Sequence, residues 1–213
     1  MSRTDINQRI NRKRGFNMAS KSDIRRNTSI FKHETESVMI DFAGDVIGYK
    51  VMALDEYKNA GAIYIYADYN KEVKTDTIIN DALKNGKKVA LPRVYTMSVT
   101  GDGKPDKYMK FHYISSTDDL EKGYNGIREP KEDLPCADGD TAEGIMIMPV
   151  VGFDDARNRV GYGGGFYDKY LSSHSFIKKI GIAYDEQKVD KVEDAAEHDI
   201  KPDIIVTQKE IYR

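Results

Sequence analysis

Residues 62–92, AIYIYADYNKEVKTDTIINDALKNGKKVALP, decide the fold class of this chain. Their first six residues are apolar, β-branched or aromatic, so they predict a buried strand. A helix capped by Thr75 is expected next, because apolar residues recur at helical spacing until Asn85-Gly86 ends the pattern. A second strand, 88–91, follows at once and is expected to end at Pro92. The crossover has the length of a connection between parallel strands, which predicts a strand–helix–strand unit.

The segments on either side extend the same pattern. A helix is expected from Ser20 to about Glu36, because Ser20 and Asp23 are placed to cap its start. Residues 95–107 are predicted to be a turn-rich loop, and 115–143 an acidic surface loop with one short helical turn. The other expected elements are a helix over 37–49, strands over 108–114, 145–148, 179–184 and 204–207, and a helix near 167–172. This order predicts an α/β fold with an open, mostly parallel sheet flanked by helices and a ligand cleft at the carboxyl ends of the strands.

The composition indicates a globular protein with a small ligand. Of 213 residues, 33 are Lys or Arg and 35 are Asp or Glu, so no overall basic field points to a nucleic acid or a membrane as partner. Cys136 is the single cysteine, which excludes an intrachain disulfide and favours a reducing compartment. No apolar run approaches the roughly 18 residues of a membrane-spanning helix. The cytoplasm is therefore the expected compartment.

The start of the chain differs from the rest. Residues 1–19 are polar and rich in basic side chains, so we expect a mobile basic tail before a single α/β domain over 20–213. A transit peptide is a minority alternative, because Asp5 and breaks in the amphipathic spacing oppose it. Met18 is an alternative start of the protein, and association of residues 3–14 with RNA is a further alternative.

The run from Pro149 to Asp168, PVVGFDDARNRVGYGGGFYD, carries the chemistry. It follows an apolar strand and opens a helix, which is where open α/β sheets bind ligands. Arg159 adds a forked donor for phosphate oxygens, and Asp168 is a candidate ligand of a Mg²⁺ ion that bridges phosphates. Four clustered glycines permit positive φ and close approach of backbone N–H groups to an anion; they are Gly161, Gly163, Gly164 and Gly165.

Two better-known phosphate loops are excluded by spacing. A dinucleotide fingerprint that starts at Gly161 requires a glycine where Phe166 stands, and a P-loop requires a GK[ST] ending that is absent. Two simpler interpretations stay open. The glycines could form a flexible turn without a ligand, and Asp168 could serve only to stabilise the helix dipole.

The same run resembles the signature of a known family, the 5-formyltetrahydrofolate cyclo-ligases, also called 5,10-methenyltetrahydrofolate synthetases. A Lys-x-x-Leu-Arg helix of that family is matched by Lys21 to Arg25, with Ile24 in place of leucine. Other segments that match in family order are 71–75, 86–92, 109–111, 126–130, 183–187, 198–199 and 204–207. The resemblance covers nearly the whole chain from Lys21 onward.

The resemblance implies a mainly monomeric enzyme that uses ATP, Mg²⁺ and 5-formyltetrahydrofolate. The formyl oxygen attacks the γ-phosphate of ATP, and a second folate nitrogen then displaces the phosphate, which gives 5,10-methenyltetrahydrofolate, ADP and phosphate. Such a phosphoryl transfer needs cations and backbone donors rather than a nucleophilic side chain. A nucleotide- or folate-binding regulatory module without turnover is the alternative.

The residue roles are carried over from positions in the family motif. The resemblance assigns catalysis to Lys21 and Arg159, and Mg²⁺ binding to Asp168 and Asp199. It assigns folate binding to Ala67, Glu72 and Tyr167. The residues that it assigns to ATP are Lys21, Arg25, Arg159, Val160, Gly161, Tyr162, Gly163, Gly164, Gly165, Phe166 and Tyr167.

Taken alone, several of these residues have simpler interpretations. Lys21 and Arg25 lie four residues apart, a spacing typical of solvated cations on a surface helix. Glu72 would be an ordinary charge near a helix start. The sequence also departs from the family pattern, because Phe166 stands where tyrosine is common and Ala67 where a larger apolar residue would line the folate pocket. The second departure leaves the tightness of folate binding open.

Overall fold

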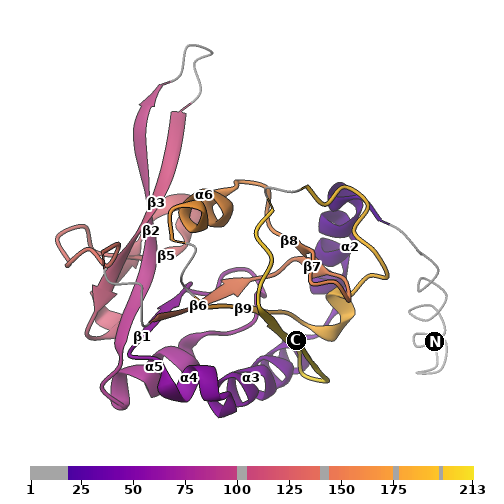
Figure 1. Cartoon of the computed structure of the whole chain (residues 1–213), viewed down its shortest axis with the longest axis horizontal. Helices are drawn as coiled ribbons and strands as arrows, with labels where there is room; N and C mark the ends of the chain where they lie inside the picture. Colours follow the sequence, from indigo (N-terminus) through magenta and orange to yellow (C-terminus); the bar gives the residue numbers. More distant parts are fainter. Residues whose placement is uncertain (1–18, 100–104, 140–143, 175–177, 197–198) are drawn as a thin grey trace.

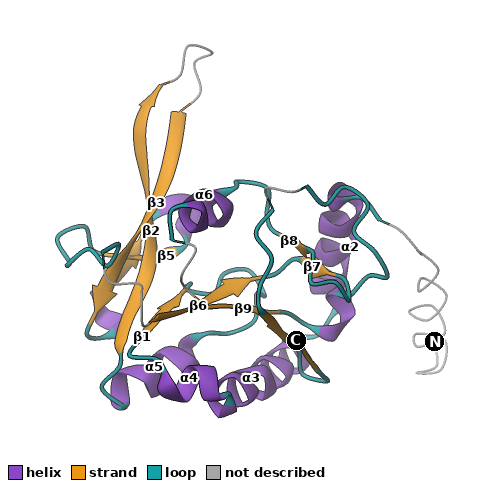
Figure 2. Cartoon of the chain, in the orientation of Figure 1, coloured by secondary structure: helices purple, strands orange, loops and turns teal. Residues whose placement is uncertain are grey.

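The computed structural model describes residues 19–99, 105–139, 144–174, 178–196 and 199–213. A seven-stranded sheet forms its centre, with the strand order β11-β10-β9-β6-β1-β2-β3 (Figures 1 and 2). The five inner strands run parallel to one another, whereas the edge strands β3 and β11 pair antiparallel with their neighbours. The prediction of an open, mostly parallel sheet flanked by helices is therefore confirmed.

The elements have the following bounds. The helices are α2 (Lys21–Glu34), α3 (Ser37–Ala53), α4 (Asp55–Asn59), α5 (Asp76–Lys84) and α6 (Phe166–Ser172). The strands of the large sheet are β1 (Ala62–Ile65), β2 (Lys88–Val99), β3 (Pro105–Ile114), β6 (Gly144–Pro149), β9 (Lys178–Ile182), β10 (Ile204–Val206) and β11 (Ile211–Tyr212). Two short pairs lie outside this sheet, namely β4 (Leu120–Lys122) with β5 (Arg128–Pro130) and β7 (Gly152–Phe153) with β8 (Arg159–Val160).

The alternation of side chains along the strands divides the core into two layers. Ile63 and Ile65 on β1 belong to the layer that contains α3, α4 and α5, whereas Tyr64 belongs to the layer with α6 (Figure 1). On β6 the same period separates Ile147 from Met146. All five side chains are 0% exposed. A strand buried on both faces is apolar along its whole length, which is why the two-residue period cannot be read from the sequence alone.

Helix α2 begins where its capping residues predict. The Ser20 hydroxyl oxygen accepts a hydrogen bond from the Asp23 backbone nitrogen at 3.2 Å, which satisfies one of the free donors of the first helical turn. The next helix is longer than expected, since α3 continues to Ala53 rather than ending near residue 49. Burial of Val51 against the sheet accounts for the extra turn.

Helix α2 is docked on the β7–β8 pair. Its buried Ile24 packs against Val160 on β8. One turn further on, Thr28 donates its hydroxyl to the carbonyl of Val151 at 2.7 Å. These contacts fix the first half of α2 beside the segment that carries the clustered glycines.

Strand β2 does not end at Pro92 as expected. It continues to Val99 and pairs with β3, so the described part of the expected loop over 95–107 is a strand hairpin that extends away from the sheet in Figure 1. Pairing with β1 stops at Ala90. From Pro92 onward, β3 is the strand with which β2 pairs in the described part of the large sheet. A proline lacks an N–H donor and is tolerated where one side of a strand is open.

Thr75 precedes α5, but its hydroxyl does not cap the helix. The hydroxyl donates to the Tyr66 carbonyl at 2.8 Å, and the Thr75 backbone nitrogen donates to Asp68 Oδ1 at 3.1 Å. Both bonds connect the start of α5 to the segment that leaves β1. The loop over 66–75, which contains Glu72, is therefore closed at its base.

Ala19 belongs to the folded domain and not to the basic tail. Its side chain is 3% exposed, it forms a bridge with Val192, and its nitrogen donates to the Lys191 carbonyl at 3.1 Å. The predicted boundary after residue 19 is therefore too late by at least one residue. The rest of the expected tail, residues 1–18, lies outside the described residues.

Several short elements were not expected. The predicted acidic loop over 115–143 contains β4 and β5, and α4, β7, β8 and β11 occur where no element was predicted. Each has two to five residues. Such lengths are too short for a periodic apolar pattern to appear.

Candidate active site

The predicted site residues lie where the parallel strands end. Loops 66–75, 150–165 and 183–203 follow the carboxyl ends of β1, β6 and β9. Helix α2 and the β7–β8 pair lie beside one another at this end of the sheet (Figure 1). An open α/β sheet presents its loops for ligand binding at this edge.

Arg159 is the central cation of this region. Its side chain is only 4% exposed, and its Nη2 donates to Asp168 Oδ1 at 2.9 Å. Its Nε is buried without a hydrogen-bond partner in the part of the chain that the structure describes. The guanidinium carbon also lies 5.9 Å from the centre of the Tyr167 ring. Arg159 is therefore fixed by one ion pair and retains a donor for which no acceptor is present.

A tight turn before β8 holds Arg159 in place. Both oxygens of the buried Asp154 accept hydrogen bonds from Asn158, the first from its backbone nitrogen at 2.9 Å and the second from its side-chain amide at 2.7 Å. Arg157, inside the turn, adopts a φ of 58°. The Asp-x-x-x-Asn spacing therefore has a structural role that the sequence analysis did not assign.

Lys21 pairs with the second predicted metal ligand. Lys21 Nζ lies 2.6 Å from Asp199 Oδ2, and both side chains are 18% exposed. The residue after Asp199 reaches the first predicted ligand, because the Ile200 nitrogen donates to Asp168 Oδ1 at 3.2 Å. Four predicted residues from three separate segments, Lys21, Arg159, Asp168 and Asp199, thus form one charged cluster. His198, which shares a family motif with Asp199, lies outside the described residues.

Arg25 binds the glycine loop, by which we mean residues 161–165. Its Nε donates to the Gly161 carbonyl at 2.8 Å. Gly163 and Gly165 have φ values of 99° and 65°, which favour glycine, whereas Gly161 and Gly164 are not in this region. The prediction of positive φ is therefore correct for two of the four glycines.

The other two glycines provide space for side chains. A Cβ atom on Gly161 would lie 2.9 Å from Nη1 of Arg159. A Cβ atom on Gly164 would lie 2.9 Å from the ring of Phe166. Because both contacts are closer than a Cβ normally makes, these positions admit only glycine unless the neighbouring side chain moves.

Glu72 lies in a crowded polar environment at the other end of the site. Its Oε2 accepts a hydrogen bond from the Tyr69 backbone nitrogen at 2.9 Å, and the neighbouring Tyr162 hydroxyl is a second donor that lowers the pKa of the carboxyl group. Burial raises the pKa of Glu72, and the hydrogen bonds and the nearby Lys32 ammonium oppose this shift. Tyr184 donates to the Glu72 carbonyl at 3.0 Å, which also fixes the backbone.

Four tyrosines surround Glu72, namely Tyr66, Tyr162, Tyr167 and Tyr184. Burial is the main cause that raises the pKa of Tyr66, Tyr167 and Tyr184, and the negative charge of Glu72 contributes to each shift. Tyr162 is 58% exposed as a whole residue, so the burial that raises its pKa concerns the hydroxyl end near Glu72. The phenols therefore stay protonated at neutral pH. The Tyr66 hydroxyl donates to the Val73 carbonyl at 2.9 Å and the Tyr184 hydroxyl to the Glu72 carbonyl, so both are already used within the protein.

Two predicted contact residues lie in the core. Ala67 is 2% exposed and Val160 is 0% exposed. The Val160 carbonyl already accepts a hydrogen bond from the Val151 nitrogen at 2.8 Å. Their predicted contacts with folate and ATP stay predictions, and the packing gives them no support.

Lys32 is a residue of the site that the sequence analysis missed. Its Nζ donates to the Tyr162 hydroxyl oxygen at 2.8 Å. It lies seven positions after Arg25 and eleven after Lys21 on α2, so the three cations share one helix face. The helical spacing of the three cations is present in the sequence, but the family motif ends at Arg25 and does not include Lys32.

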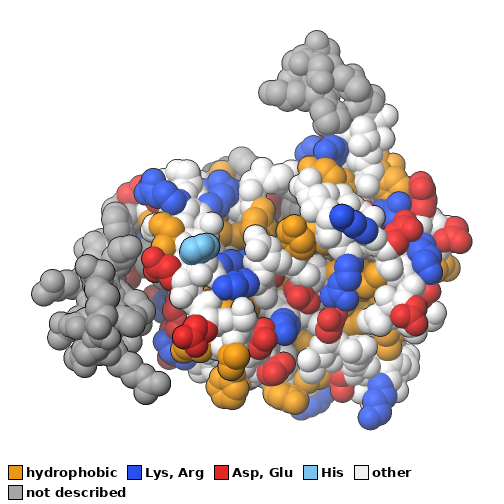
Figure 3. Space-filling model, turned by 180° about the vertical axis from the view of Figure 1, so that it is seen from behind, with side chains coloured by type: hydrophobic (Ala, Val, Ile, Leu, Met, Phe, Trp, Pro, Cys, Tyr) orange, Lys and Arg blue, Asp and Glu red, His pale blue; other side chains and the backbone are white. Residues whose placement is uncertain are grey.

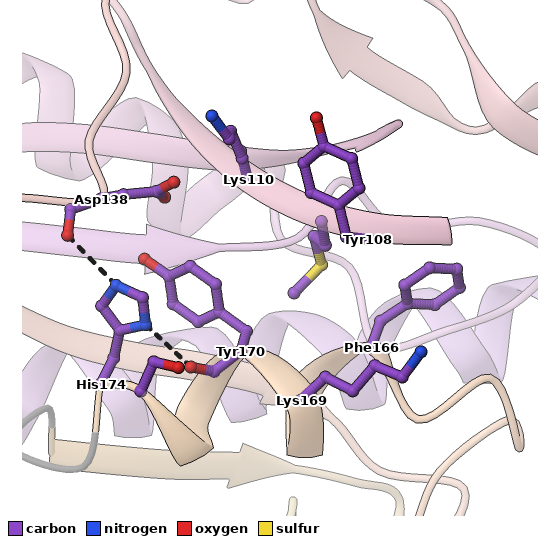
Figure 4. A pocket seen from close by; sticks show the side chains of 9 residues that line it. Tyr108, Lys110, Asp138, Phe166, Lys169, Tyr170 and His174 are labelled. Atoms are coloured by element: carbon purple, nitrogen blue, oxygen red, sulfur yellow. Dashed lines mark hydrogen bonds between the residues drawn. The ribbon is translucent and has the colours of Figure 1, made fainter. Parts of the chain in front are cut away.

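A pocket of about 200 Å³ opens between β3 and α6 (Figure 4). Tyr108 and Lys110 line it from β3, and Phe166, the one predicted ATP-binding residue among its lining residues, lines it from α6. At its far side the ring nitrogens of His174 lie 2.8 Å from the Tyr170 carbonyl and 3.1 Å from the Asp138 carbonyl. The pocket adjoins the glycine loop through Phe166 but does not contain the charged cluster.

The surface and the donor groups place further limits on the ligand. Acidic and basic side chains are interspersed over the face in Figure 3. Among the described residues no helix is long and apolar enough to span a membrane, and no three His, Cys, Asp or Glu side chains are placed to hold a metal ion together. A metal ion at Asp168 and Asp199 would therefore need further oxygens from a bound molecule.

Comparison with known proteins first defines the class of this chain, which is a ligase. A protein-family model described as the 5-formyltetrahydrofolate cyclo-ligase family matches residues 17–208. The probable 5-formyltetrahydrofolate cyclo-ligase of Schizosaccharomyces pombe is 30% identical over 188 residues, which cover 82% of this chain and 88% of that protein. The 5-formyltetrahydrofolate cyclo-ligase of Mus musculus is 30% identical over 167 residues, which cover 74% and 78%. The chain belongs to the 5-formyltetrahydrofolate cyclo-ligase family.

Solved structures agree with this family. The 5,10-methenyltetrahydrofolate synthetase of Aquifex aeolicus superposes with a TM-score of 0.74 at 25% identity, over 91% of this chain and 92% of that one. The synthetase of Mycoplasma pneumoniae gives a TM-score of 0.62 at 22% identity, over 89% and 99%, and this second likeness concerns the fold alone. The resemblance expected from the sequence motifs is confirmed.

Proposed function

We propose that this chain binds ATP between α2 and the glycine loop and binds 5-formyltetrahydrofolate beside Glu72. It closes the folate to 5,10-methenyltetrahydrofolate, and ADP and phosphate are released. Membership of the cyclo-ligase family supports the reaction. The arrangement of charged groups described above supports the division into a phosphate end and a folate end.

The observation that carries the phosphate end is the unpartnered Nε of Arg159. Leaving a buried donor unsatisfied costs about 1–3 kcal/mol, and more for a charged group. Such an atom calls for an acceptor that the chain itself does not supply. A phosphate oxygen meets this need, because a guanidinium donates to phosphate in a forked geometry.

Lys21 and Arg25 complete the phosphate end. Lys21 is paired with Asp199 and Arg25 with the Gly161 carbonyl, so both side chains are held near Arg159 in a fixed arrangement. Three phosphate groups carry more negative charge than two carboxylates. ATP would therefore share or replace the carboxylates as partners of these cations.

Asp168 and Asp199 fit a Mg²⁺ ion. Mg²⁺ in such sites is bound by one or two carboxylates together with phosphate oxygens and water. Asp168 Oδ1 is engaged by Arg159 and Ile200, whereas Oδ2 has no partner among the described residues. When bound, Mg²⁺ neutralises charge on the phosphates during transfer.

The glycine-loop segment connects the two ends of the site. Gly161 contacts Arg25, while Tyr162 contacts Glu72. Tyr167, at the start of α6, lies 5.9 Å from the Arg159 guanidinium, and the charges of both Arg159 and Glu72 act on the pKa of its phenol. A folate held beside Glu72 is thereby brought next to the terminal phosphate, and positioning of this kind supplies most of the catalysis in phosphoryl transfer.

The proposal is tested by following product formation. The chain is mixed with ATP, MgCl₂ and 5-formyltetrahydrofolate, and the near-ultraviolet band of the methenyl product is recorded. We expect the band to grow only when all three are present. Binding of both ligands, measured by calorimetry, without growth of the band would contradict the proposal and favour a binding module without turnover.

A further inference from the structure

Lys32 reaches the folate end of the site from α2. Its Nζ donates to the Tyr162 hydroxyl oxygen at 2.8 Å and lies 5.4 Å from the centre of the Tyr162 ring. The ammonium therefore contacts the hydroxyl at the rim of the ring, close to the line of the C–O bond, and not the face of the ring.

The Tyr162 hydroxyl joins Lys32 to Glu72. An ammonium group only donates, and an ionised carboxylate only accepts. The phenol accepts from Lys32, and its own O–H is left to donate toward the neighbouring Glu72 carboxylate, whose pKa it lowers; this order gives the three groups a single direction. The three members come from α2, from the glycine loop and from the loop after β1.

The polar contacts are what holds Tyr162 in this position. The residue is 58% exposed, so packing does not fix its ring. Glu72 has a second anchor, because its Oε2 accepts a hydrogen bond from the Tyr69 nitrogen at 2.9 Å. Removing the ammonium would therefore free Tyr162 first, and Glu72 would then be held from one side only.

We propose that Lys32 is a positioning residue of the folate end: through Tyr162 it orients the Glu72 carboxylate toward the substrate. The inference rests on the proposed function and extends it to a side chain outside the family motif. A carboxylate fixed in this way accepts N–H donors from the substrate in one defined geometry, and fixed geometry is what makes such charge-assisted bonds strong.

Charge at the folate end agrees with this role. Burial lowers the pKa of Lys32, and the nearby Glu72 carboxylate opposes that shift. Loss of the ammonium would raise the pKa of Glu72 further, because its charge favours the ionised carboxylate. The ionisable groups that face Glu72 are Lys32 from α2, Tyr66 and Asp68 from the loop after β1, Tyr162 and Tyr167 from the glycine loop and α6, and Tyr184 from the end of β9.

The test compares two helix-end lysines in the full chain. Lys32→Met removes the ammonium at the end of α2, and Lys84→Met does the same at the exposed end of α5 as a matched control. We expect Lys32→Met to raise the KM for 5-formyltetrahydrofolate about tenfold, the effect of losing one charge-assisted hydrogen bond. The KM for ATP should stay within about twofold for both variants, because the phosphate groups bind elsewhere.

Two more readouts separate orientation from a merely structural role. In Lys32→Met, the pH at which kcat/KM for the folate falls on the acidic side should be higher than in the unaltered chain. Lys32→Arg keeps the charge, so it should restore both the KM for the folate and this acidic limb of the pH profile. Tyr162→Phe should match Lys32→Met, and the double variant should lose little more. This second variant keeps the inference testable if Lys32→Met folds poorly.

The outcomes distinguish this inference from the proposed function. Without methenyl product from the unaltered chain, the proposed function fails and the inference fails with it. With product formed, an unchanged folate KM and pH profile in both Lys32→Met and Tyr162→Phe overturns the role of Lys32 alone. A rise confined to the KM for ATP overturns it as well, and would assign Lys32 to the phosphate end.

Discussion

The phosphate end and the folate end of the site are built on opposite principles. At the phosphate end, charges are paired within the protein, as in Arg159 with Asp168 and Lys21 with Asp199. At the folate end, the Glu72 carboxylate has phenols around it, and among the described residues Lys32 is the lysine that reaches it through the Tyr162 hydroxyl. Paired charges keep cations in place until a more highly charged ligand arrives. Phenols beside a carboxylate instead suit a flat ring with few charges, so the difference supports the proposed assignment of one substrate to each end.

Replacing Arg159 would break the comparison most strongly. Arg159→Met leaves Asp168 without its ion-pair partner and removes the buried donor, so we expect kcat/KM for ATP to fall by about two to three orders of magnitude. The KM for the folate should change far less. Steady-state kinetics with each substrate varied in turn measures both, and an equal loss for the two substrates would show that the ends are not separate.

Asp168→Asn tests the metal assignment at the phosphate end. The amide keeps the shape of the side chain but loses the charge, so we expect turnover to fall about tenfold to a hundredfold, with the largest deficit at limiting Mg²⁺. The melting temperature should fall much less than activity. Normal turnover at limiting Mg²⁺ would mean that Asp168 serves Arg159 and the helix start alone.

A glycine substitution sharpens the comparison through space rather than charge. Gly161→Val places a Cβ where Nη1 of Arg159 lies 2.9 Å away, so the guanidinium must shift. We expect the KM for ATP to rise about tenfold, as for a misdirected charge-assisted bond. Gly139→Ala is the control, because no atom lies within 4 Å of a Cβ there. Equal constants for the two variants would contradict the role of Gly161.

The pH dependence of folate binding is the smallest of the expected effects. Burial raises the pKa of Glu72, and the carboxylate must be ionised to accept substrate N–H donors. Folate affinity should therefore be full above that pKa and decline as the pH falls through it. Glu72→Gln should weaken binding and abolish the decline. A decline that persists in Glu72→Gln would have to be assigned to another group.

The sequence was sufficient for those parts of the fold that depend on local signals. Ser20 and Asp23 cap α2 as expected, and the apolar strands before and after α5 are parallel. The extent of β2 could not be predicted, because it depends on the open side beyond Pro92 and on pairing with β3. Ala19 was misassigned for a similar reason, since its partner Val192 is distant in the sequence.

The site could be predicted as a set of residues but not as a set of contacts. Lys21, Arg159, Asp168 and Asp199 were named from the motif, and the structure adds that they pair with one another. Ion pairing of Lys21 with Asp199 joins residues 178 positions apart, a separation at which the sequence gives no signal. Lys32 lies on the same face of α2 as Lys21 and Arg25, but it stands outside the family motif, so the motif could not predict it.

Gly161 and Tyr162 are neighbours in the sequence, and this has a consequence for how each substrate would affect the affinity for the other. Arg25 binds the Gly161 carbonyl, and Tyr162 lies beside Glu72. The peptide unit between Gly161 and Tyr162 therefore joins the phosphate end to the folate end. When a nucleotide immobilises this peptide, part of the entropy cost of ordering it is incurred on nucleotide binding. The folate, which binds to the ordered peptide, then incurs less of that cost. Thermodynamic reciprocity then requires each substrate to raise the affinity for the other by the same factor. With both substrates bound as proposed, synergy between them would follow from the backbone itself.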